Sequence, residues 1–233
     1  VADARRGLQL LSKELSGYQA NAEWVARANQ VRAEWREVQK DILAAQAETT
    51  IPSDAQVVAA VNQSVSDQAI IVAASGSLPA ELHKHWNSGA VGGYHLEYGY
   101  SCMGYEISGG VGVKLAEPER EVVVMVGDGS YLMMNSDIAT AVSLGLQMTI
   151  VVLDNRGFSC INRLQMATGG ANFNNLLRDT RNAGLADIDF ATHAGTMGAR
   201  SQHAKNIGEL KNSVAAASQH PGVSVIVIDT DPM

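Results

Sequence analysis

Two polar segments that follow apolar runs carry the residues best suited to binding a metal ion. Gly127-Asp128-Gly129-Ser130 follows a run that ends at Val126, and Asn155 lies just beyond a second run, Thr149–Leu153. Glycine lets the backbone approach a ligand closely, and amide groups ahead of a helix bind anionic oxygens. Asp128 could hold a metal in this setting, although an Asp-Gly pair is also typical of an ordinary turn.

The spacing between Asp128 and Asn155 favours a metal site. The separation is close to the ~30 residues of one strand–helix–strand unit, which would bring both residues to the same end of neighbouring parallel strands. Magnesium prefers about six oxygen ligands, usually from few protein groups together with phosphate and water. A carboxylate, an amide oxygen and a backbone carbonyl meet that requirement, and a diphosphate would supply most of the remaining oxygens.

The hydrophobic pattern predicts the elements that must position these segments. Nearly all-apolar runs, typical of strands covered on both faces, occupy residues 69–74, 122–126, 149–153 and 223–228. Amphipathic patterns predict helices near residues 54–66, 104–115, 135–144, 187–197 and 206–218. This alternation predicts an α/β domain with a parallel sheet and helices on both faces. Such domains bind ligands beyond the carboxyl ends of their strands.

Residues 1–50 differ from that pattern. Apolar residues recur every three or four positions from Trp24 to Ile42, and a shorter leucine stripe precedes them on the other side of Gly17. Two helices are therefore predicted, and they could not bury a core alone. We expect residues 1–50 to be the end of a preceding middle domain or a docking arm, and residues 51–233 to form the ligand-binding domain. The first residue is Val1 rather than Met, which is consistent with a fragment, a processed chain or an incomplete sequence.

The composition excludes several classes of protein. The 233 residues are 46% hydrophobic, which is enough for a core, and the net charge of -7 argues against nucleic-acid binding. No apolar run approaches the ~20 residues that span a membrane, and we find no signal peptide. The two cysteines, Cys102 and Cys160, form no disulfide framework. A cytoplasmic protein is expected.

Residues from about 52 to 229 resemble the thiamine-diphosphate-dependent enzymes. The resemblance lies in a Gly-Asp-Gly motif, a gap of about 25 residues, and an Asn at the end of an apolar strand. It implies that magnesium is held by the side chains of Asp128 and Asn155 and by the carbonyl of Gly157. Contacts with the diphosphate would come from Gly127, Gly129 and Ser130. Where the family often has Asn-Asn, this chain has Asp154-Asn155.

Three further segments fit the same resemblance. Gly76 and Ser77 would contact the diphosphate from the other side, although such small residues also suit a simple turn. Met103 matches a large apolar residue that wedges beneath the cofactor and holds it bent, although a methionine more often fills a core. The family's usual glycine is Ser101 here, and the Ser101 carbonyl and Met103 amide would meet the pyrimidine ring. Phe158 would pack near the cofactor.

A closer resemblance is to the trihydroxycyclohexane-1,2-dione hydrolases of myo-inositol catabolism. It is carried by the segments 95–105, 76–79 and 158–166. The implied reaction is hydrolytic cleavage of a ring carbon–carbon bond between two carbonyl carbons. It would convert 3D-(3,5/4)-trihydroxycyclohexane-1,2-dione to 5-deoxy-glucuronate. Acetolactate synthases share the metal motif but have different residues around the wedge.

Several side chains beside the implied site could have either a functional or a purely structural role. His95, Glu97 and Tyr98 precede the wedge and are candidate substrate-side groups, or they form a hydrogen-bonded loop. Cys102 and Cys160 flank the site, where a thiolate role is possible but packing as small apolar residues is favoured.

The resemblance also implies a part that we do not find in the sequence. Family members need a glutamate that activates the cofactor and sits in a pyrimidine-binding domain. That domain would come from a missing part of the chain or from a partner subunit. A homodimer or homotetramer is expected, because the family builds its site between subunits.

Other functions remain open from sequence alone. One is an acetolactate synthase or 2-oxoacid decarboxylase, which would act on a 2-oxoacid. Another is a noncatalytic, nucleotide- or cofactor-binding α/β module. A third is a regulatory or assembly subunit that keeps the fold but has lost the chemistry.

Overall fold

The computed structural model describes residues 3–44, 51–184 and 186–232. The chain divides into two compact units, Val1–Ala44 and Ala45–Met233. The predicted domain division after residue 50 adjoins residues 45–50, which lie outside the described residues, so that division stays a prediction. In the described part of the chain, no helix has the length and apolar character needed to cross a membrane.

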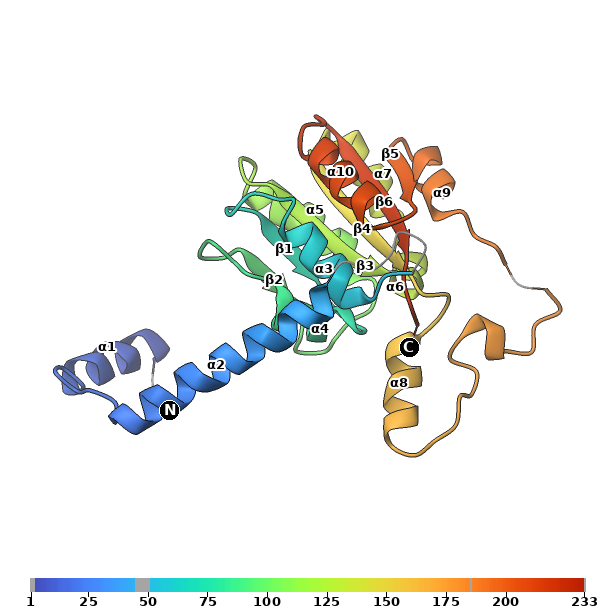
Figure 1. Cartoon of the computed structure of the whole chain (residues 1–233). Helices are drawn as coiled ribbons and strands as arrows, with labels where there is room; N and C mark the ends of the chain where they lie inside the picture. Colours follow the sequence, from blue (N-terminus) through green and yellow to red (C-terminus); the bar gives the residue numbers. More distant parts are fainter. Residues whose placement is uncertain (1–2, 45–50, 185, 233) are drawn as a thin grey trace. The chain divides into compact units, whose positions relative to one another are not determined.

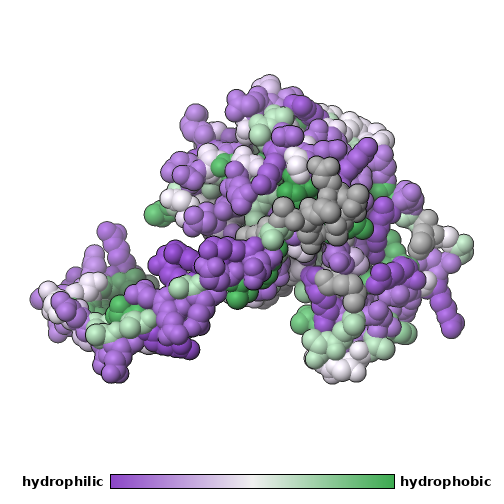
Figure 2. Space-filling view, viewed as in Figure 1, coloured by the Kyte–Doolittle hydropathy of each residue, from purple (hydrophilic) through white to green (hydrophobic). Residues whose placement is uncertain are grey.

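The first unit consists of two helices, α1 (Ala4–Glu14) and α2 (Ala22–Leu43), so the predicted N-terminal helical segment is confirmed. Gly17 lies between them with a φ of 80°, in the left-handed region that glycine adopts most readily. Each helix starts with a side-chain cap, from Asp3 and Asn21 respectively. Most residues of the predicted apolar stripes are exposed, whereas Trp35 is half-buried, and Figure 2 shows green side chains among the purple ones on this pair.

The second unit is built on one parallel six-stranded sheet with the order β2-β1-β3-β4-β6-β5 (Figure 1). Its strands are β1 (Ile70–Ala73), β2 (Tyr94–Leu96), β3 (Val122–Gly127), β4 (Met148–Asp154), β5 (Arg200–Ala204) and β6 (Val223–Asp229). The four predicted apolar runs are the four central strands, so the α/β fold class with a parallel sheet is confirmed.

The two edge strands, β2 and β5, were not predicted. β2 has only three residues, all half-buried, and β5 is exposed or half-buried along most of its length. Edge strands are covered less than central ones and therefore lack the continuous apolar run by which a buried parallel strand is recognised.

Helices cover both faces of the sheet, as predicted, and each face has its own core (Figure 1). One core joins the sheet to α5 (Tyr105–Ala116), α6 (Asp128–Met133), α7 (Asp137–Ser143) and α9 (Phe190–Thr196). The other joins it to α3 (Asp54–Asn62), α4 (Leu78–His85) and α10 (Ile207–Ser218). Side chains of β3 alternate between the two, with Val124 in the first core and Met125 in the second.

Four helices differ from the sequence-based expectation. The helix expected over 54–66 ends at Asn62, although its predicted cap forms, since Ser53 accepts a hydrogen bond from the Gln56 amide. α4 and α8 (Ser159–Ala167) were not predicted. Asp128, expected in a turn, is instead the first residue of α6, which also contains Gly129 and Ser130. Asp, Gly and Ser have low helix propensity, and the buried position of α6 overrides that preference.

Two glycines of α5 provide a matched test of the packing between this helix and the sheet. A Cβ on Gly110 would lie 2.3 Å from Cγ2 of Val124 in β3, whereas a Cβ on Gly112 would meet nothing within 4 Å. We expect Gly110→Ala to lower the free energy of unfolding by about 1–3 kcal/mol through overpacking. Gly112→Ala should raise it by up to ~1 kcal/mol through helix propensity. Urea denaturation of both variants checks this; equal effects would contradict the packing described.

Candidate cofactor and metal site

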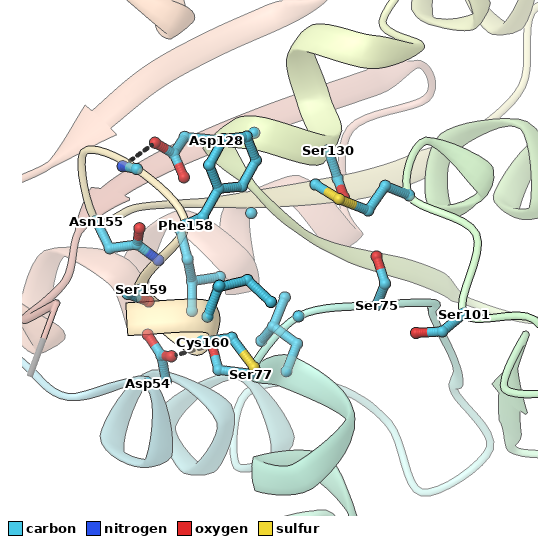
Figure 3. Close-up of a pocket in the computed structure, with 18 of the residues that line it drawn as sticks. Asp54, Ser75, Ser77, Ser101, Asp128, Ser130, Asn155, Phe158, Ser159 and Cys160 are labelled. Carbon is cyan, nitrogen blue, oxygen red and sulfur yellow. Dashed lines mark hydrogen bonds between the residues drawn. The ribbon is translucent and has the colours of Figure 1, made fainter. Parts of the chain in front are cut away.

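A cavity of about 340 Å³ opens at the carboxyl ends of β1, β3 and β4. Figure 3 shows Asp128 and Asn155 on one side of it, with Ser75, Ser101 and Ser130 on the other. Its lining includes every residue that was predicted to bind the cofactor or the metal, namely Gly76, Ser77, Ser101, Met103, Gly127, Asp128, Gly129, Ser130, Asn155, Gly157 and Phe158. The fold therefore gathers these predicted positions around one space, as expected for ligand binding beyond parallel strands.

Asp128 is a buried carboxylate that accepts a hydrogen bond from the loop after β4. Its side chain is only 6% exposed, and Oδ2 accepts a hydrogen bond of 2.9 Å from the Gly157 amide. Burial, with the nearby charge of Asp154, raises the pKa of Asp128 to about 7. A carboxyl group in such surroundings is stabilised in its charged form by an adjacent cation.

Asn155 presents an oxygen that lacks a partner. The residue is 7% exposed, and within the described residues its buried side-chain Oδ1 has no hydrogen-bond partner. Buried polar atoms are nearly always paired, so such an oxygen calls for a ligand. Because β3 and β4 are neighbours with Gly127 opposite Leu153, Asp128 and Asn155 follow adjacent strands at the same edge. A carboxylate and an amide oxygen are ligands that magnesium accepts, so this pair fits the ion.

The loop that carries Asn155 is shaped by Asp154. Its Oδ1 accepts the Arg156 amide at 3.0 Å, and its Oδ2 lies 3.1 Å from Nε of the same arginine. Arg156 has a φ of 59°, which is uncommon for a residue other than glycine. In the sequence, Asp154 stands out only as a departure from the Asn-Asn pair of the family pattern. An Asp followed by a turn is typical of a side chain that bonds the backbone two residues on, and this signal could have revealed its role.

Gly157 occupies a position that a larger residue could not share. Its φ is 150°, and a Cβ there would lie 2.5 Å from the carbonyl oxygen of Asn175. The next residue, Phe158, donates its amide to that same oxygen at 2.7 Å. The loop that carries Asn155 therefore packs closely against the segment around Asn175 at Gly157. The Gly157 amide also donates a hydrogen bond to Asp128.

On the opposite wall, the Ser77 hydroxyl already has a partner. It donates to Oδ2 of Asp54 at 2.5 Å, an interaction that Figure 3 marks with a dashed line. A hydroxyl has one hydrogen to donate, so Ser77 would offer a diphosphate its backbone amide. Gly76 has a φ of 86° and open space at its Cβ position, which suits close approach of a ligand.

Asp54 is a lining residue that the sequence analysis did not single out. It is buried at the start of α3, and Nη2 of Arg163 lies 3.4 Å from the Oδ2 atom that Ser77 also contacts. The lining further includes Ser75, Ser159 and Leu164, which were not predicted either. Their signals in the sequence are ordinary, because a small or apolar residue after a strand is common.

Met103 and Phe158 form an apolar wall near Gly129. A Cβ on Gly129 would lie 2.8 Å from Cε1 of Phe158 and 3.6 Å from Cε of Met103. Met103 is 37% exposed and lines the cavity, so it is not buried as core filling. Ser101, two residues earlier, has a φ of 52°. A ligand ring that enters the cavity would therefore meet a thioether and an aromatic ring.

The three candidate substrate-side groups lie outside the cavity lining. A ring nitrogen of His95 is 2.6 Å from the Tyr105 hydroxyl, and Tyr98 is exposed. The Glu97 carboxylate accepts backbone amides of its own loop. A hydrogen-bonded loop describes His95 and Glu97 as they lie here, and a role toward substrate stays a prediction. Cys160 lines the cavity whereas Cys102 is exposed outside it, and both thiols are free.

Comparison with known proteins places the chain among cofactor-dependent enzymes. The family model for the thiamine pyrophosphate enzyme, C-terminal TPP binding domain, matches residues 74–228. A protein of Clostridium botulinum (strain Eklund 17B / Type B) named 3D-(3,5/4)-trihydroxycyclohexane-1,2-dione hydrolase is 43% identical over 178 residues, which cover 74% of this chain and 28% of that protein. A protein of the same name from Shouchella clausii is 34% identical over 255 residues, covering 100% of this chain and 40% of the relative.

The solved structures that match share the fold. Benzoylformate decarboxylase from Polynucleobacter necessarius superposes with a TM-score of 0.70 at 19% identity, over 82% of this chain and 35% of that one. A thiamine diphosphate-dependent 4-hydroxybenzoylformate decarboxylase from Rhodococcus jostii gives a TM-score of 0.70 at 21% identity, over 81% and 34%. The chain thus spans well under half the length of the relatives it matches.

Proposed function

The chain belongs to the thiamine pyrophosphate enzymes, whose C-terminal cofactor-binding domain it carries, and from this premise we propose that its cavity binds thiamine diphosphate together with Mg²⁺. The observation that carries the magnesium site is the buried Oδ1 of Asn155, which has no hydrogen-bond partner among the described residues, beside the buried carboxylate of Asp128. The side chains of Asp128 and Asn155 would hold the ion, with the carbonyl of Gly157 as a third ligand.

The other lining residues divide between the two ends of the cofactor. Backbone groups approach a diphosphate most closely at glycines, so the phosphate contacts are assigned to Gly76, Ser77, Gly127, Gly129 and Ser130. Met103 would support the ring end, with Ser101 beside it and Phe158 across from it. When bound, thiamine diphosphate supplies a thiazolium carbon that stabilises the carbanion left by carbon–carbon bond cleavage. The chain's own contribution is to anchor, orient and shield that group from water.

For the reaction, we propose hydrolysis of a cyclic 1,2-dione, 3D-(3,5/4)-trihydroxycyclohexane-1,2-dione, to 5-deoxy-glucuronate in inositol catabolism. Support comes from relatives of that name at 34–43% identity. A 2-oxoacid decarboxylase is the second candidate, because solved decarboxylases share the fold, although at 19–21% identity. An acetolactate synthase or a noncatalytic cofactor-binding module would use the same fold.

Because the chain spans 28–40% of these relatives, we further propose that other parts complete the enzyme. A pyrimidine-binding domain, with its activating glutamate, would come from the rest of the protein or from a partner subunit. Residues 1–50 would end a middle domain, and residues 51–233 would be the diphosphate-binding domain. A cytoplasmic homodimer or homotetramer would suit a site shared between subunits.

Product analysis separates the candidate reactions. The full-length protein, loaded with thiamine diphosphate and Mg²⁺, is supplied separately with the cyclic dione, pyruvate and benzoylformate, and products are followed by NMR. We expect ring opening of the dione and a rate at least ~100-fold lower with the two 2-oxoacids, because a substrate whose polar groups are unmatched loses several kcal/mol of transition-state binding. Faster turnover of either 2-oxoacid would replace the proposed substrate, and no turnover of any would favour the noncatalytic module.

A further inference from the structure

The turn that presents Met103 to the cavity is held in an unusual backbone conformation. Between β2 and α5, Ser101 has a φ of 52° and Gly104 a φ of 92°. Both values lie in the left-handed region, and a non-glycine residue stays there only when its surroundings hold it. A Cβ at Gly104 would also lie 2.9 Å from Cγ of Met134, so this turn is confined by its neighbours.

Glu97 fastens the first half of this turn. Its Oε1 accepts the Tyr100 amide at 3.0 Å, and its Oε2 accepts the Cys102 amide at 2.7 Å. These bonds lower the pKa of Glu97, so the group is ionised at neutral pH. Both carboxylate oxygens face the backbone of their own turn, and the residue does not line the cavity.

Glu106 fastens the second half from inside the protein. It is 1% exposed, and its Oε2 accepts the Gly104 amide at 2.9 Å. Burial raises the pKa of Glu106, although the nearby Ser130 hydroxyl and Ser75 amide favour its charged form. Among the residues that the structure describes, its Oε1 has no hydrogen-bond partner. Ser75 and Ser130 line the cavity, so Glu106 lies behind its wall.

We propose that Glu97 and Glu106 are positioning residues that clamp the turn on either side of Met103 and so hold its thioether in the cavity. The clamp rests on the proposed function, since Met103 is taken to support the ring end of thiamine diphosphate. The amides held by the two carboxylates, at Cys102 and Gly104, directly flank Met103. Glu97 then acts through the turn rather than on substrate.

The clamp predicts that the ring end and the diphosphate end of the cofactor respond differently to substitution. In the full-length protein, Glu97→Ala and Glu106→Ala should weaken binding of thiamine diphosphate with Mg²⁺ by about tenfold, the worth of one or two backbone hydrogen bonds. Binding of inorganic diphosphate with Mg²⁺ should stay within about twofold of wild type in Glu97→Ala, because the two amides that Glu97 accepts belong to its own turn and not to the residues assigned to the diphosphate. Calorimetric titration measures both constants.

Conservative variants sharpen the test. Glutamine at position 106 keeps one acceptor oxygen for the Gly104 amide, so Glu106→Gln should bind the cofactor nearly as wild type. Glu97→Gln keeps one acceptor for two amides and should lie between wild type and Glu97→Ala. Glu117→Ala, at the exposed far end of α5, is the matched control and should change nothing.

Amide hydrogen exchange tests the hydrogen bonds of Glu97 and Glu106 in the ligand-free protein. The Cys102 amide should exchange faster in Glu97→Ala, and the Gly104 amide faster in Glu106→Ala, by about tenfold each. Unchanged exchange at these amides would overturn the proposal, as would an equal loss of diphosphate and cofactor binding in Glu97→Ala. A raised KM for the dione in Glu97→Ala, with cofactor binding intact, would make Glu97 a substrate contact instead. If the wild type itself bound no cofactor, the proposed function would fall, and exchange alone would decide the clamp.

Discussion

Asp128→Ala is expected to abolish the magnesium-dependent binding of thiamine diphosphate, with a loss of at least ~100-fold in affinity. Even residues that merely orient metal ligands contribute 10–100-fold, so removal of a direct ligand should exceed that range. The same change should leave the ligand-free protein as stable as wild type or more so, since a buried carboxylate without a cation is costly. Calorimetry gives the affinity, and thermal unfolding with and without ligands gives the stability.

A loss of cofactor affinity without a loss of stability would show that Asp128→Ala removes a metal-binding carboxylate and does not damage the fold. Asp154→Asn is the matched control, because an asparagine oxygen can still accept the Arg156 amide that Asp154 binds at 3.0 Å. It should bind the cofactor within a few fold of wild type. If Asp128→Ala lowered the unfolding temperature of the ligand-free protein and left cofactor affinity intact, Asp128 would be a structural residue and the metal assignment would be wrong.

The second large effect is expected from Gly157→Ala. A new Cβ would lie 2.5 Å from the Asn175 carbonyl oxygen and 2.9 Å from the Cα of Leu176, and both are backbone atoms that cannot rotate away. Combined with the φ of 150°, we expect a loss of about 2–4 kcal/mol in the free energy of unfolding. Displacement of the loop would also break the 2.9 Å hydrogen bond to Asp128 and weaken magnesium binding.

Gly184→Ala is the control for this prediction, because a Cβ there meets nothing within 4 Å and its φ is unremarkable. In urea denaturation, the free energies of unfolding of the two variants should differ by about 2–4 kcal/mol. The affinity for magnesium should fall only in Gly157→Ala. Equal stability of the two alanine variants would show that the segment around Asn175 moves to accommodate the new methyl group. The close packing of Gly157 would then not contribute to stability.

The central strands were predictable because burial on both faces of the sheet requires a nearly continuous run of apolar residues. β3, β4 and β6 are apolar at most positions, and nearly every residue of these three strands is buried. β2 and β5 are edge strands that are covered less than the central ones, so they lack the continuous apolar run of a buried parallel strand. α6 begins with Asp-Gly-Ser, and its helical form depends on tertiary packing that local propensity does not report.

The site was predictable as far as its residues follow strands. Asp128 and Asn155 are brought together by the pairing of β3 with β4, which the strand–helix–strand spacing anticipates. The roles of Asp54, Asp154 and Glu106 depend on which backbone amides or side chains lie beside their carboxylates. A sequence shows that a carboxylate is present but not which groups lie beside it. The two amides that Glu97 accepts were therefore not predictable, and its role toward substrate stays a prediction.

The most direct test of the cofactor site is a calorimetric titration of the full-length protein with thiamine diphosphate, in the presence and absence of Mg²⁺. If Asn155 Oδ1 and Asp128 bind Mg²⁺, thiamine diphosphate should bind tightly with the ion present and at least ~100-fold more weakly after chelation. The reason is that the metal would link protein oxygens to the diphosphate. Equal affinity with and without Mg²⁺, or no binding by the folded wild-type protein, would contradict the site described.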